Sequence, residues 1–160
     1  MMARLANAPA SDTEVHLEAL SMSRLDALLD IENSAYEFPW TRGNFLDSMA
    51  SGYALQLLCA GEQILGYFVA MHCVDEVHLL NLTVAPQAQR QGWSVLLLEA
   101  LALWAGGRGA QWLWLEVRCH NLRAQAVYQR FGFRQVAVRP RYYPAAGGAR
   151  EDAVVMSLSL

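Results

Sequence analysis

The sequence contains no lysine, and all 12 of its basic residues are arginines. Against 15 acidic residues they leave a net charge of −3, which does not favour non-specific binding to nucleic acid. The apolar run from Val95 to Ala105 is too short to cross a bilayer and contains Glu99. We therefore expect no direct nucleic-acid partner and no membrane partner.

Patterns typical of metal sites and disulfides are also missing. The three cysteines, Cys59, Cys73 and Cys119, are odd in number and lack C-x-x-C spacing, which argues against a disulfide framework and a zinc site. The four histidines show no ligand spacing either. We expect buried, reduced cysteines and no metal.

The N-terminus lacks the basic start and long apolar run of a signal peptide, so we expect a cytoplasmic protein. With 160 residues, of which 54% are hydrophobic, the chain is long enough to bury a core. It shows no internal repeat and no low-complexity linker. We therefore expect a flexible tail over residues 1–13 and a single domain over residues 14–160.

The stretch from Leu79 to Trp104 carries the strongest pattern. The run Leu79–Val84 alternates and is rich in Leu and Val, which predicts a buried strand closed by Pro86. A polar loop with Arg90 and Gly92 follows, and then a segment that is apolar on nearly every side, which predicts a buried helix. This order directs free backbone N–H groups and the positive end of a helix dipole at an anion. We therefore expect a phosphate site.

The loop is neither a G-x-G-x-x-G turn nor a Walker loop, so a mononucleotide hydrolase is not favoured. Upstream of it, the residue pattern predicts two helices and three strands. These are a strand over Glu14–Ala19, a helix capped by Ser23, a short helix capped by Thr41, and a hairpin of Tyr53–Ala60 with Ile64–Val74.

The run Trp112–Val117 is hydrophobic on both faces, which predicts a strand in the middle of a sheet, parallel to the earlier one. Glu116 shares a face with Trp112 and Trp114, so its carboxylate is a candidate general base. Arg118 lies on the same face, and a plain Glu–Arg pair at the end of a strand is the alternative.

Asn121 is expected to cap a helix over Leu122–Phe131 that stops at Gly132. Tyr128 lies two turns after Asn121 on the same side, about 10 Å along the axis, so one extended ligand could touch both. A plain helix cap and a core aromatic residue are the alternatives.

Two last strands, Phe133–Val138 and Asp152–Leu158, are expected to flank a long aromatic loop, Arg139–Gly148. Loops of this kind often bind ligands or partners.

Several of these motifs, in this order, resemble the GNAT N-acetyltransferases, and in particular the RimI branch, the ribosomal-protein alanine N-acetyltransferases. Gln89–Ser94 is similar to the Q/R-x-x-G-x-G/A loop that holds the pyrophosphate of acetyl-CoA in this family, with Ser94 in place of the usual Gly or Ala. From about residue 14 to the C-terminus, the other matching segments are Phe38–Thr41, Asn44–Phe45, Leu115–Arg118, Asn121, Ala126–Phe133, Tyr142–Pro144 and Arg150–Ala153.

The resemblance implies the α/β (α+β) GNAT fold: a mixed central sheet of about six to seven strands, flanked by about four helices, with a splayed central parallel pair that holds acetyl-CoA. It also implies which residues contact the cofactor. These are the backbone of Leu82, Thr83 and Val84 along the acetyl-pantetheine arm, the loop residues Arg90, Gln91, Gly92, Trp93, Ser94 and Val95 around the pyrophosphate, and Asn121 further along.

In this branch the residue at the position of Glu116 is the general base, and the residue at the position of Tyr128 is the general acid. An α-amino group has a pKa of about 8 and is mostly protonated at neutral pH, so acetyl transfer to it needs a base. A backbone N–H near Val84 is a candidate donor to the oxyanion. Cys119 is not expected to be a nucleophile, because its neighbour His120 would point to the opposite side of a continuing strand.

The implied reaction is transfer of acetyl to the N-terminal α-amino group of a protein, with the N-terminal alanine of a small-subunit ribosomal protein as the expected acceptor. Two alternatives stay open: acetylation of a small amine such as a polyamine or an aminoglycoside, and a non-catalytic acyl-CoA-binding regulatory module. The expected walls of a peptide groove are Trp40, Tyr142 and Tyr143. Acidic residues expected to receive a basic tail are Glu32, Glu37 and Asp152.

Overall fold

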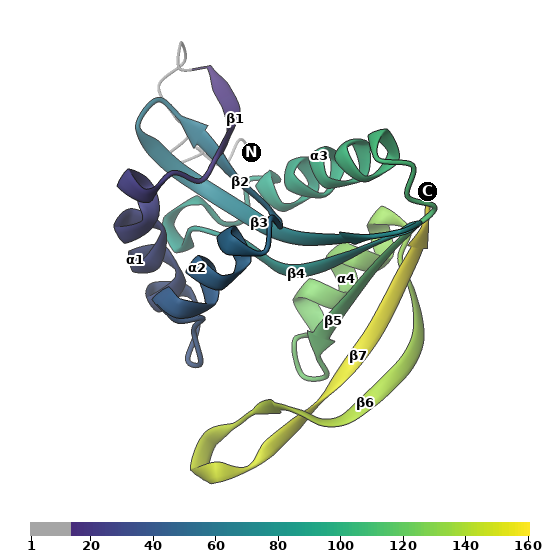
Figure 1. Ribbon diagram of the computed structural model, residues 1–160. Coiled ribbons are helices and arrows are strands. Elements are labelled where there is room, and N and C mark those ends of the chain that lie inside the picture. The colour runs from purple at the N-terminus through teal and green to yellow at the C-terminus, as the bar shows by residue number, and fades with distance from the viewer. Residues whose placement is uncertain (1–13) are drawn as a thin grey trace, which may run out of the picture. The chain divides into compact units, whose positions relative to one another are not determined.

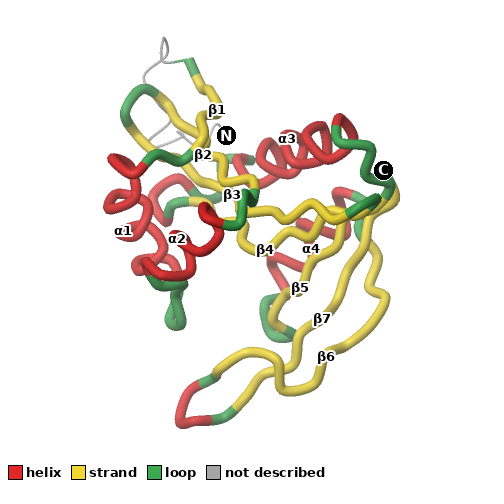
Figure 2. Tube along the Cα trace, viewed as in Figure 1, coloured by secondary structure: helices red, strands yellow, loops and turns green. Residues whose placement is uncertain are grey.

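The computed structural model describes residues 14–160, so the expected tail over residues 1–13 lies outside the described part. Seven strands and four α-helices form within it (Figures 1 and 2). In chain order they are β1 (Val15–Ala19), α1 (Leu25–Ala35), α2 (Arg42–Ala50), β2 (Ala54–Ala60), β3 (Gln63–Cys73), β4 (Glu76–Val84), α3 (Trp93–Gly107), β5 (Trp112–Arg118), α4 (Leu122–Phe131), β6 (Arg134–Pro144) and β7 (Arg150–Ser159). None of the helices in this part of the chain has the length and apolar character needed to cross a membrane.

The strands form one mixed sheet in the order β1-β2-β3-β4-β5-β7-β6, which confirms the expected fold class. β4 and β5 are parallel, and their pairing runs from Glu76 opposite Trp112 to Leu79 opposite Leu115. β5 continues its antiparallel pairing with β7 as far as Arg118. Within the described residues β4 and β5 therefore part after Leu79, as the resemblance implies for the central parallel pair.

Contacts along the chain group its residues into two compact units, and β3, β4 and α3 each contribute residues to both. The first unit holds residues 14–68 and Leu82–Leu97. In its core, the buried rings of Phe45 and Tyr67 meet edge to face at 6.1 Å. Leu25 and Leu28 of α1 are also fully buried. Burying each such leucine contributes about 1.5–3 kcal/mol of stability.

The second unit holds Val69–Asn81 and Leu98–Leu160. Leu113 and Leu115 point into its core from β5, and Leu101 and Met156 are buried with them in the same unit. The alternation along β5 leaves Glu116 on the less buried face, as its position in the strand predicts. The expectation of a single domain stays a prediction.

The two short helices of the first unit begin differently. Thr41 caps α2 as expected: its hydroxyl accepts from the Asn44 N–H at 3.2 Å, and the Asn44 side chain accepts from the Thr41 N–H at 2.9 Å. The prediction that Ser23 caps the preceding helix is wrong. Its hydroxyl bonds that of Ser21 at 2.9 Å within a short 3-10 turn, Met22–Arg24, and α1 begins only after it.

The C-terminal strands are longer than predicted. β6 and β7 form a long hairpin, so most of the expected loop is strand, and only the tip around Ala146–Gly148 lies outside them (Figures 1 and 2). The register shifts between Arg139 and Tyr143, where Arg141 takes a positive φ of 53°. β6 contains Pro140, but it is the last strand of the sheet, and an edge strand tolerates a residue without an N–H.

Candidate active site

The polar loop between β4 and α3 belongs to the first unit. Arg90 and Gly92 both have positive φ, 62° and 86°, and such turns direct successive N–H groups into an anion-binding concavity. A Cβ built on Gly92 meets no atom within 4 Å, so its surroundings are open. Arg90 is exposed and makes no ion pair with any residue that the structure describes. The loop therefore combines an accessible backbone with an available cation.

Both ends of this loop are fixed by local hydrogen bonds. The Gln89 side chain donates to the Val84 carbonyl at 3.3 Å, and the Trp93 indole N–H donates to the Gln91 side chain at 3.2 Å. Trp93 begins α3, and Ser94 and Val95 follow in its first turn. Val95 is 42% exposed, so the helix starts with an accessible apolar side chain beside the loop.

The end of β4 is held by a tyrosine that follows α1. The Tyr36 hydroxyl donates to the Leu82 carbonyl at 3.2 Å and lies 2.7 Å from the buried Thr83 hydroxyl. Burial raises the pKa of Tyr36 to about 12, so the phenol stays protonated at neutral pH. A Cβ on Gly66 would lie 2.5 Å from the Thr83 carbonyl oxygen, so β3 passes very close to this point. The backbone at Leu82–Val84 is thus rigidly placed.

Glu32 lies in the same unit and is buried, with 1% of its surface exposed. Its carboxylate accepts from the Tyr67 hydroxyl at 2.6 Å and from the Trp40 N–H at 3.3 Å. The expectation that Glu32 receives a basic tail is therefore wrong, because a buried and bonded carboxylate cannot meet a peptide in solvent. Glu32 instead holds the backbone at Trp40, whose ring lies 5.2 Å from that of Phe45.

Glu116 lies in the second unit with only 7% of its side chain exposed. One carboxylate oxygen lies 2.5 Å from His78 Nε2, and the other lies 3.4 Å from Arg139 Nε. The three side chains come from β5, β4 and β6, and no local sequence pattern marks His78 or Arg139 as a partner of Glu116. The parallel register, which sets His78 opposite Trp114, is what brings a β4 side chain beside Glu116.

Tyr142 and Tyr143 lie near this carboxylate, and their rings meet edge to face at 4.8 Å. Burial and then the negative charge of Glu116 raise the pKa of Tyr142, and Arg139, 5.7 Å from its ring, partly opposes this shift. Burial also raises the pKa of Tyr143. Both phenols are therefore neutral at physiological pH and can act as polar walls or hydrogen-bond donors.

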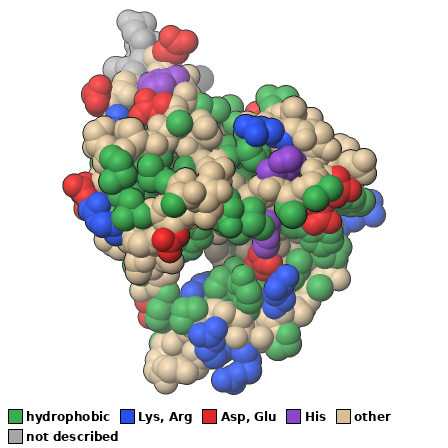
Figure 3. All heavy atoms as spheres, in the orientation of Figure 1, with side chains coloured by type: hydrophobic (Ala, Val, Ile, Leu, Met, Phe, Trp, Pro, Cys, Tyr) green, Lys and Arg blue, Asp and Glu red, His purple; other side chains and the backbone are tan. Residues whose placement is uncertain are grey.

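The hairpin that carries these tyrosines is basic on its surface. Exposed arginines, Arg139, Arg141 and Arg150, lie along it, and Figure 3 shows basic side chains gathered over this region. Asp152 accepts from the Arg141 N–H at 2.9 Å and so holds the hairpin backbone. The expectation that Asp152 attracts a basic tail is therefore not favoured.

Asn121 precedes α4 and Tyr128 lies within it, and both residues belong to the second unit. Asn121 caps the helix as predicted, since its side chain accepts from the Ala124 N–H at 3.1 Å. Tyr128 is half-buried, and its ring meets that of Phe133 at 5.7 Å. Gly132 ends the helix with a φ of 124°.

Cys119 and His120 follow the end of β5. The strand on which the expected orientation of His120 depended does not continue: β5 ends at Arg118, and after the turn His120 Nδ1 lies 3.6 Å from Cys119 Sγ. Burial and then the charge of Glu151 raise the pKa of the Cys119 thiol. A thiol with a raised pKa is a poor nucleophile at neutral pH, which agrees with direct transfer without an acetyl-enzyme.

The predicted site residues thus fall into two groups. The first unit brings together the strand and loop residues, which are Leu82, Thr83, Val84, Arg90, Gln91, Gly92, Trp93, Ser94 and Val95, and it also holds Trp40. The second unit holds Glu116, Asn121, Tyr128, Tyr142 and Tyr143.

Known acetyltransferases are similar to this chain in sequence and in structure. A model of the acetyltransferase (GNAT) family matches residues 25–133. A [ribosomal protein bS18]-alanine N-acetyltransferase from Haemophilus ducreyi is 36% identical over 144 residues, which cover 90% of this chain and 99% of that protein.

Solved structures show the same similarity. The crystal structure of the ribosomal-protein-S18-alanine N-acetyltransferase from Escherichia coli matches with a TM-score of 0.84 and 35% identity, over 91% of this chain and 94% of that one. A GNAT family acetyltransferase from Elizabethkingia anophelis with acetyl-CoA bound shares the fold, with a TM-score of 0.76 and 19% identity over 94% of this chain and 100% of that one.

Proposed function

The chain belongs to the acetyltransferase (GNAT) family, and on this premise we propose that it acetylates the N-terminal alanine of ribosomal protein bS18 with acetyl-CoA as donor. The observation that carries the proposal is the 36% identity to a bS18-alanine N-acetyltransferase over nearly the full length of both chains. A ribosomal protein as acceptor implies that the reaction takes place in the cytoplasm.

The loop from Arg90 to Val95 is the proposed pyrophosphate site. Three observations support this assignment: Arg90 and Gly92 have positive φ angles, the space around Gly92 is open, and the Arg90 guanidinium makes no ion pair with a described residue. A phosphate can approach a backbone closely only where no Cβ intervenes. The rigidly held backbone of Leu82, Thr83 and Val84 is proposed to align the acetyl-pantetheine arm, with Asn121 contacting the cofactor further along.

Glu116 is proposed to act as the general base. Its carboxylate takes a proton from the α-ammonium group, directly or through a water, and the freed nitrogen attacks the thioester carbonyl carbon. The new C–N bond forms as the C–S bond breaks, and a backbone N–H near Val84 stabilises the oxyanion. Tyr128 gives a proton to the leaving thiolate, so the products are an N-acetyl chain and free CoA.

His78 is proposed to position Glu116. At 2.5 Å its ring nitrogen fixes one carboxylate oxygen, while Arg139 lies beside the other at 3.4 Å. Fixing the rotamer of a base in this way reduces the reorganisation needed before proton transfer. Trp40, Tyr142 and Tyr143 are proposed to contact the acceptor peptide, since each presents an aromatic ring in a segment that resembles the alanine N-acetyltransferases.

The test uses synthetic peptides and mass spectrometry. One peptide carries the N-terminal sequence of the organism's own bS18, starting with alanine, and is incubated with the protein and acetyl-CoA. A second peptide, with a blocked N-terminus and a free lysine, runs beside it. The proposal expects one acetyl group on the α-amine of the first peptide and none on the second. Failure to acetylate the first peptide, with acetyl-CoA binding intact by calorimetry, would contradict it and direct the search to small amines.

A further inference from the structure

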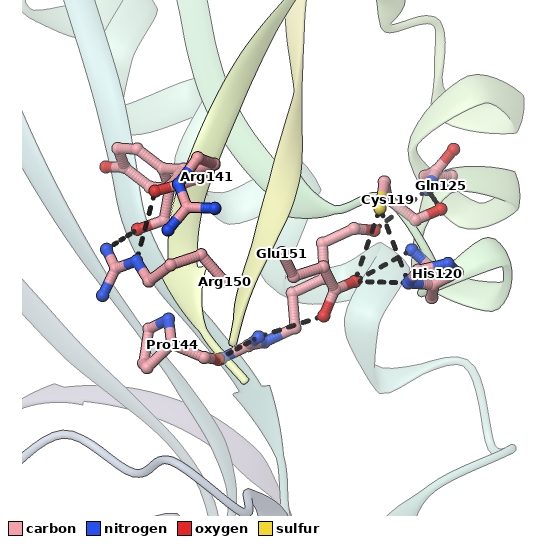
Figure 4. A network of polar contacts seen from close by, with 9 residues as sticks. Cys119, His120, Gln125, Arg141, Pro144, Arg150 and Glu151 are labelled. Atoms are coloured by element: carbon pink, nitrogen blue, oxygen red, sulfur yellow. Dashed lines mark hydrogen bonds and ion pairs between the residues drawn. The ribbon is translucent and has the colours of Figure 1, made fainter. Parts of the chain in front are cut away.

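Cys119, His120 and Glu151 bring three potential metal ligands together in the second unit (Figure 4). The sulfur lies 3.6 Å from His120 Nδ1 and 3.6 Å from Glu151 Oε2, and the nitrogen lies 3.2 Å from that oxygen. None of the three is assigned to the acetyl-transfer chemistry. We propose that Cys119, His120 and Glu151 form a binding site for a divalent transition metal of the Zn²⁺ class.

The three distances match the edges of a zinc coordination tetrahedron. With Zn–S of about 2.3 Å and Zn–N and Zn–O of about 2.0–2.2 Å, tetrahedral angles place sulfur about 3.5 Å from each of the other ligands. They place nitrogen and oxygen about 3.3 Å apart. The separations of 3.6, 3.6 and 3.2 Å therefore let one ion bind all three atoms with little movement of the protein.

The surroundings of the ligands also suit a metal. Arg118 Nη1 donates to one oxygen of Glu151 at 3.1 Å, and the His120 backbone N–H donates to the other, Oε2, at 3.0 Å, so both bonds orient the carboxylate with Oε2 at the cluster. The Gln125 side chain donates to the Cys119 carbonyl at 3.0 Å and so fixes the turn that presents the thiol. Hydrogen bonds of this kind hold ligands in place at known metal sites.

The fourth coordination position would face solvent, since 88% of the His120 side chain is exposed. A water molecule can complete the tetrahedron there. Binding releases the thiol proton to solvent, so that sulfur binds as the thiolate, and the imidazole binds through Nδ1 with its proton on Nε2. Among the described residues the ion would link the turn after β5 to the start of β7.

A second cluster shows why the proximity of three potential ligand atoms does not by itself indicate a metal site. His16, Glu18 and Cys59 also lie close together. Residues 14–160 hold two groups of potential metal ligands, this one and the cluster proposed here. There, however, the Arg24 guanidinium lies 3.4 Å from Glu18 and donates to Cys59 Sγ at 3.7 Å. The Arg24 guanidinium therefore already occupies the sulfur itself, and Cys59 is fully buried, so we assign no metal to this cluster.

The experiment measures Zn²⁺ and Co²⁺ binding to protein prepared without a histidine tag. Competition with a chromogenic chelator gives the Zn²⁺ affinity and stoichiometry, and Co²⁺ reports sulfur ligation through its thiolate-to-metal charge-transfer absorption. We expect one ion per chain and a thiolate band. Cys119→Ser should abolish the band, and both Cys119→Ser and His120→Ala should weaken Zn²⁺ binding at least about 10²-fold.

Two cysteine variants are the matched controls. Cys73 is exposed and follows His72 directly, so it forms an adjacent Cys–His pair outside both clusters. Cys73→Ser and Cys59→Ser should keep both the affinity and the band. His120 is exposed, so His120→Ala tests the site even if Cys119→Ser folds poorly. The proposal is overturned if the native chain binds no stoichiometric Zn²⁺, if the band survives in Cys119→Ser, or if His120→Ala binds Zn²⁺ as tightly as the native chain. Zn²⁺ and Co²⁺ binding are measured without any acetyl-transfer assay. A negative binding result would therefore contradict the metal site and leave the proposed acetyltransferase function untouched.

Discussion

The loop after β4 and the carboxylate on β5 represent two ways of building a functional group. In the proposed function the loop binds through its backbone, and its shape depends on neighbours in sequence such as Gly92 at a φ of 86°. In the proposed function Glu116 acts through its side chain, and the position of that side chain depends on His78 and Arg139, which come from two other strands. A local device of this kind is suited to holding a ligand, whereas a carboxylate fixed by distant residues is suited to a reaction step.

This difference predicts separable effects on kinetics. Changes in the loop should alter acetyl-CoA binding and leave the reaction step nearly intact, and changes around Glu116 should do the reverse. If the two regions act independently, a variant combining one change from each should show additive free energies within about 0.5 kcal/mol.

Glu116→Gln should have the largest effect. It keeps the shape of the side chain but removes its ability to accept a proton, so kcat should fall about 10²-fold or more. The Kd of acetyl-CoA, measured by calorimetry, should stay within about twofold of the native value if the carboxylate only accepts a proton. Unchanged turnover would remove the assignment of Glu116 as base.

Tyr128→Phe should lower kcat by about 10²-fold, because the leaving thiolate loses its proton donor. Phe keeps the edge-to-face contact with Phe133, 5.7 Å away, so the core should stay intact and the melting temperature should change little. Phe131 is a useful comparison in the same helix: Phe131→Leu alters a nearby ring, 6.2 Å from Phe133, without removing a hydroxyl. Equal losses in both variants would indicate a packing role for Tyr128.

Gly92→Ala should weaken acetyl-CoA binding about 10-fold, because a left-handed backbone is unfavourable by roughly 1–2 kcal/mol for other residues and the new Cβ stands where a phosphate would approach. The value of kcat at saturating cofactor should change little. Gly106→Ala in α3 is the control, since Gly106 is not in a left-handed conformation and has open space around it. A fall in kcat with unchanged Kd would reverse the roles given to the two regions.

His78→Ala should lower kcat about 10-fold without changing the affinity for acetyl-CoA, because Glu116 loses the partner that fixes its rotamer. A positioning role also predicts that kcat falls while the KM values for acetyl-CoA and for the peptide change little. His72→Ala is the matched control, because His72 is exposed and bonds only the Val74 carbonyl among the described residues. An unchanged kcat in His78→Ala would indicate that His78 does not position the base.

The same contrast explains what the sequence could predict. The caps at Thr41 and Asn121, the turn at Gly92 and the order of strands and helices depend on residues a few positions apart, and the structure confirms them. The partners of Glu116 and the contact of Glu151 with Cys119 join residues more than 20 positions apart. No local pattern marks such pairs, because only the strand register brings them together.

The length of β6 was missed for a related reason. Pro140 and Pro144 are turn residues by local rules, but whether a proline interrupts a strand depends on its place in the sheet. β6 is an edge strand paired only with β7 in the described chain, and Pro140 lies where the register between the two strands shifts, between Arg139 and Tyr143. The placement of Tyr142 and Tyr143 beside Glu116 follows from this extended strand rather than from a flexible loop.

Tyr36→Phe should have the smallest effect, and it tests whether the loop region is as local as its sequence suggests. The variant loses the bonds to the Leu82 carbonyl and the Thr83 hydroxyl, which should lower the free energy of unfolding by about 1 kcal/mol and raise the Kd of acetyl-CoA slightly. Tyr53→Phe, whose hydroxyl bonds no described residue, is the control.

The alkaline pH dependence of Tyr36→Phe makes the test specific. Folding raises the pKa of Tyr36 to about 12 from an ordinary value of about 10, so the folded chain holds this proton more tightly than the unfolded chain. The stability that Tyr36 contributes is therefore complete below about pH 10 and is lost as the pH rises toward 12. The difference in unfolding free energy between the native chain and Tyr36→Phe should narrow over that range. A constant difference would show that the hydroxyl does not hold the end of β4, and the rigidity of Leu82–Val84 would then rest on the close passage of β3 at Gly66.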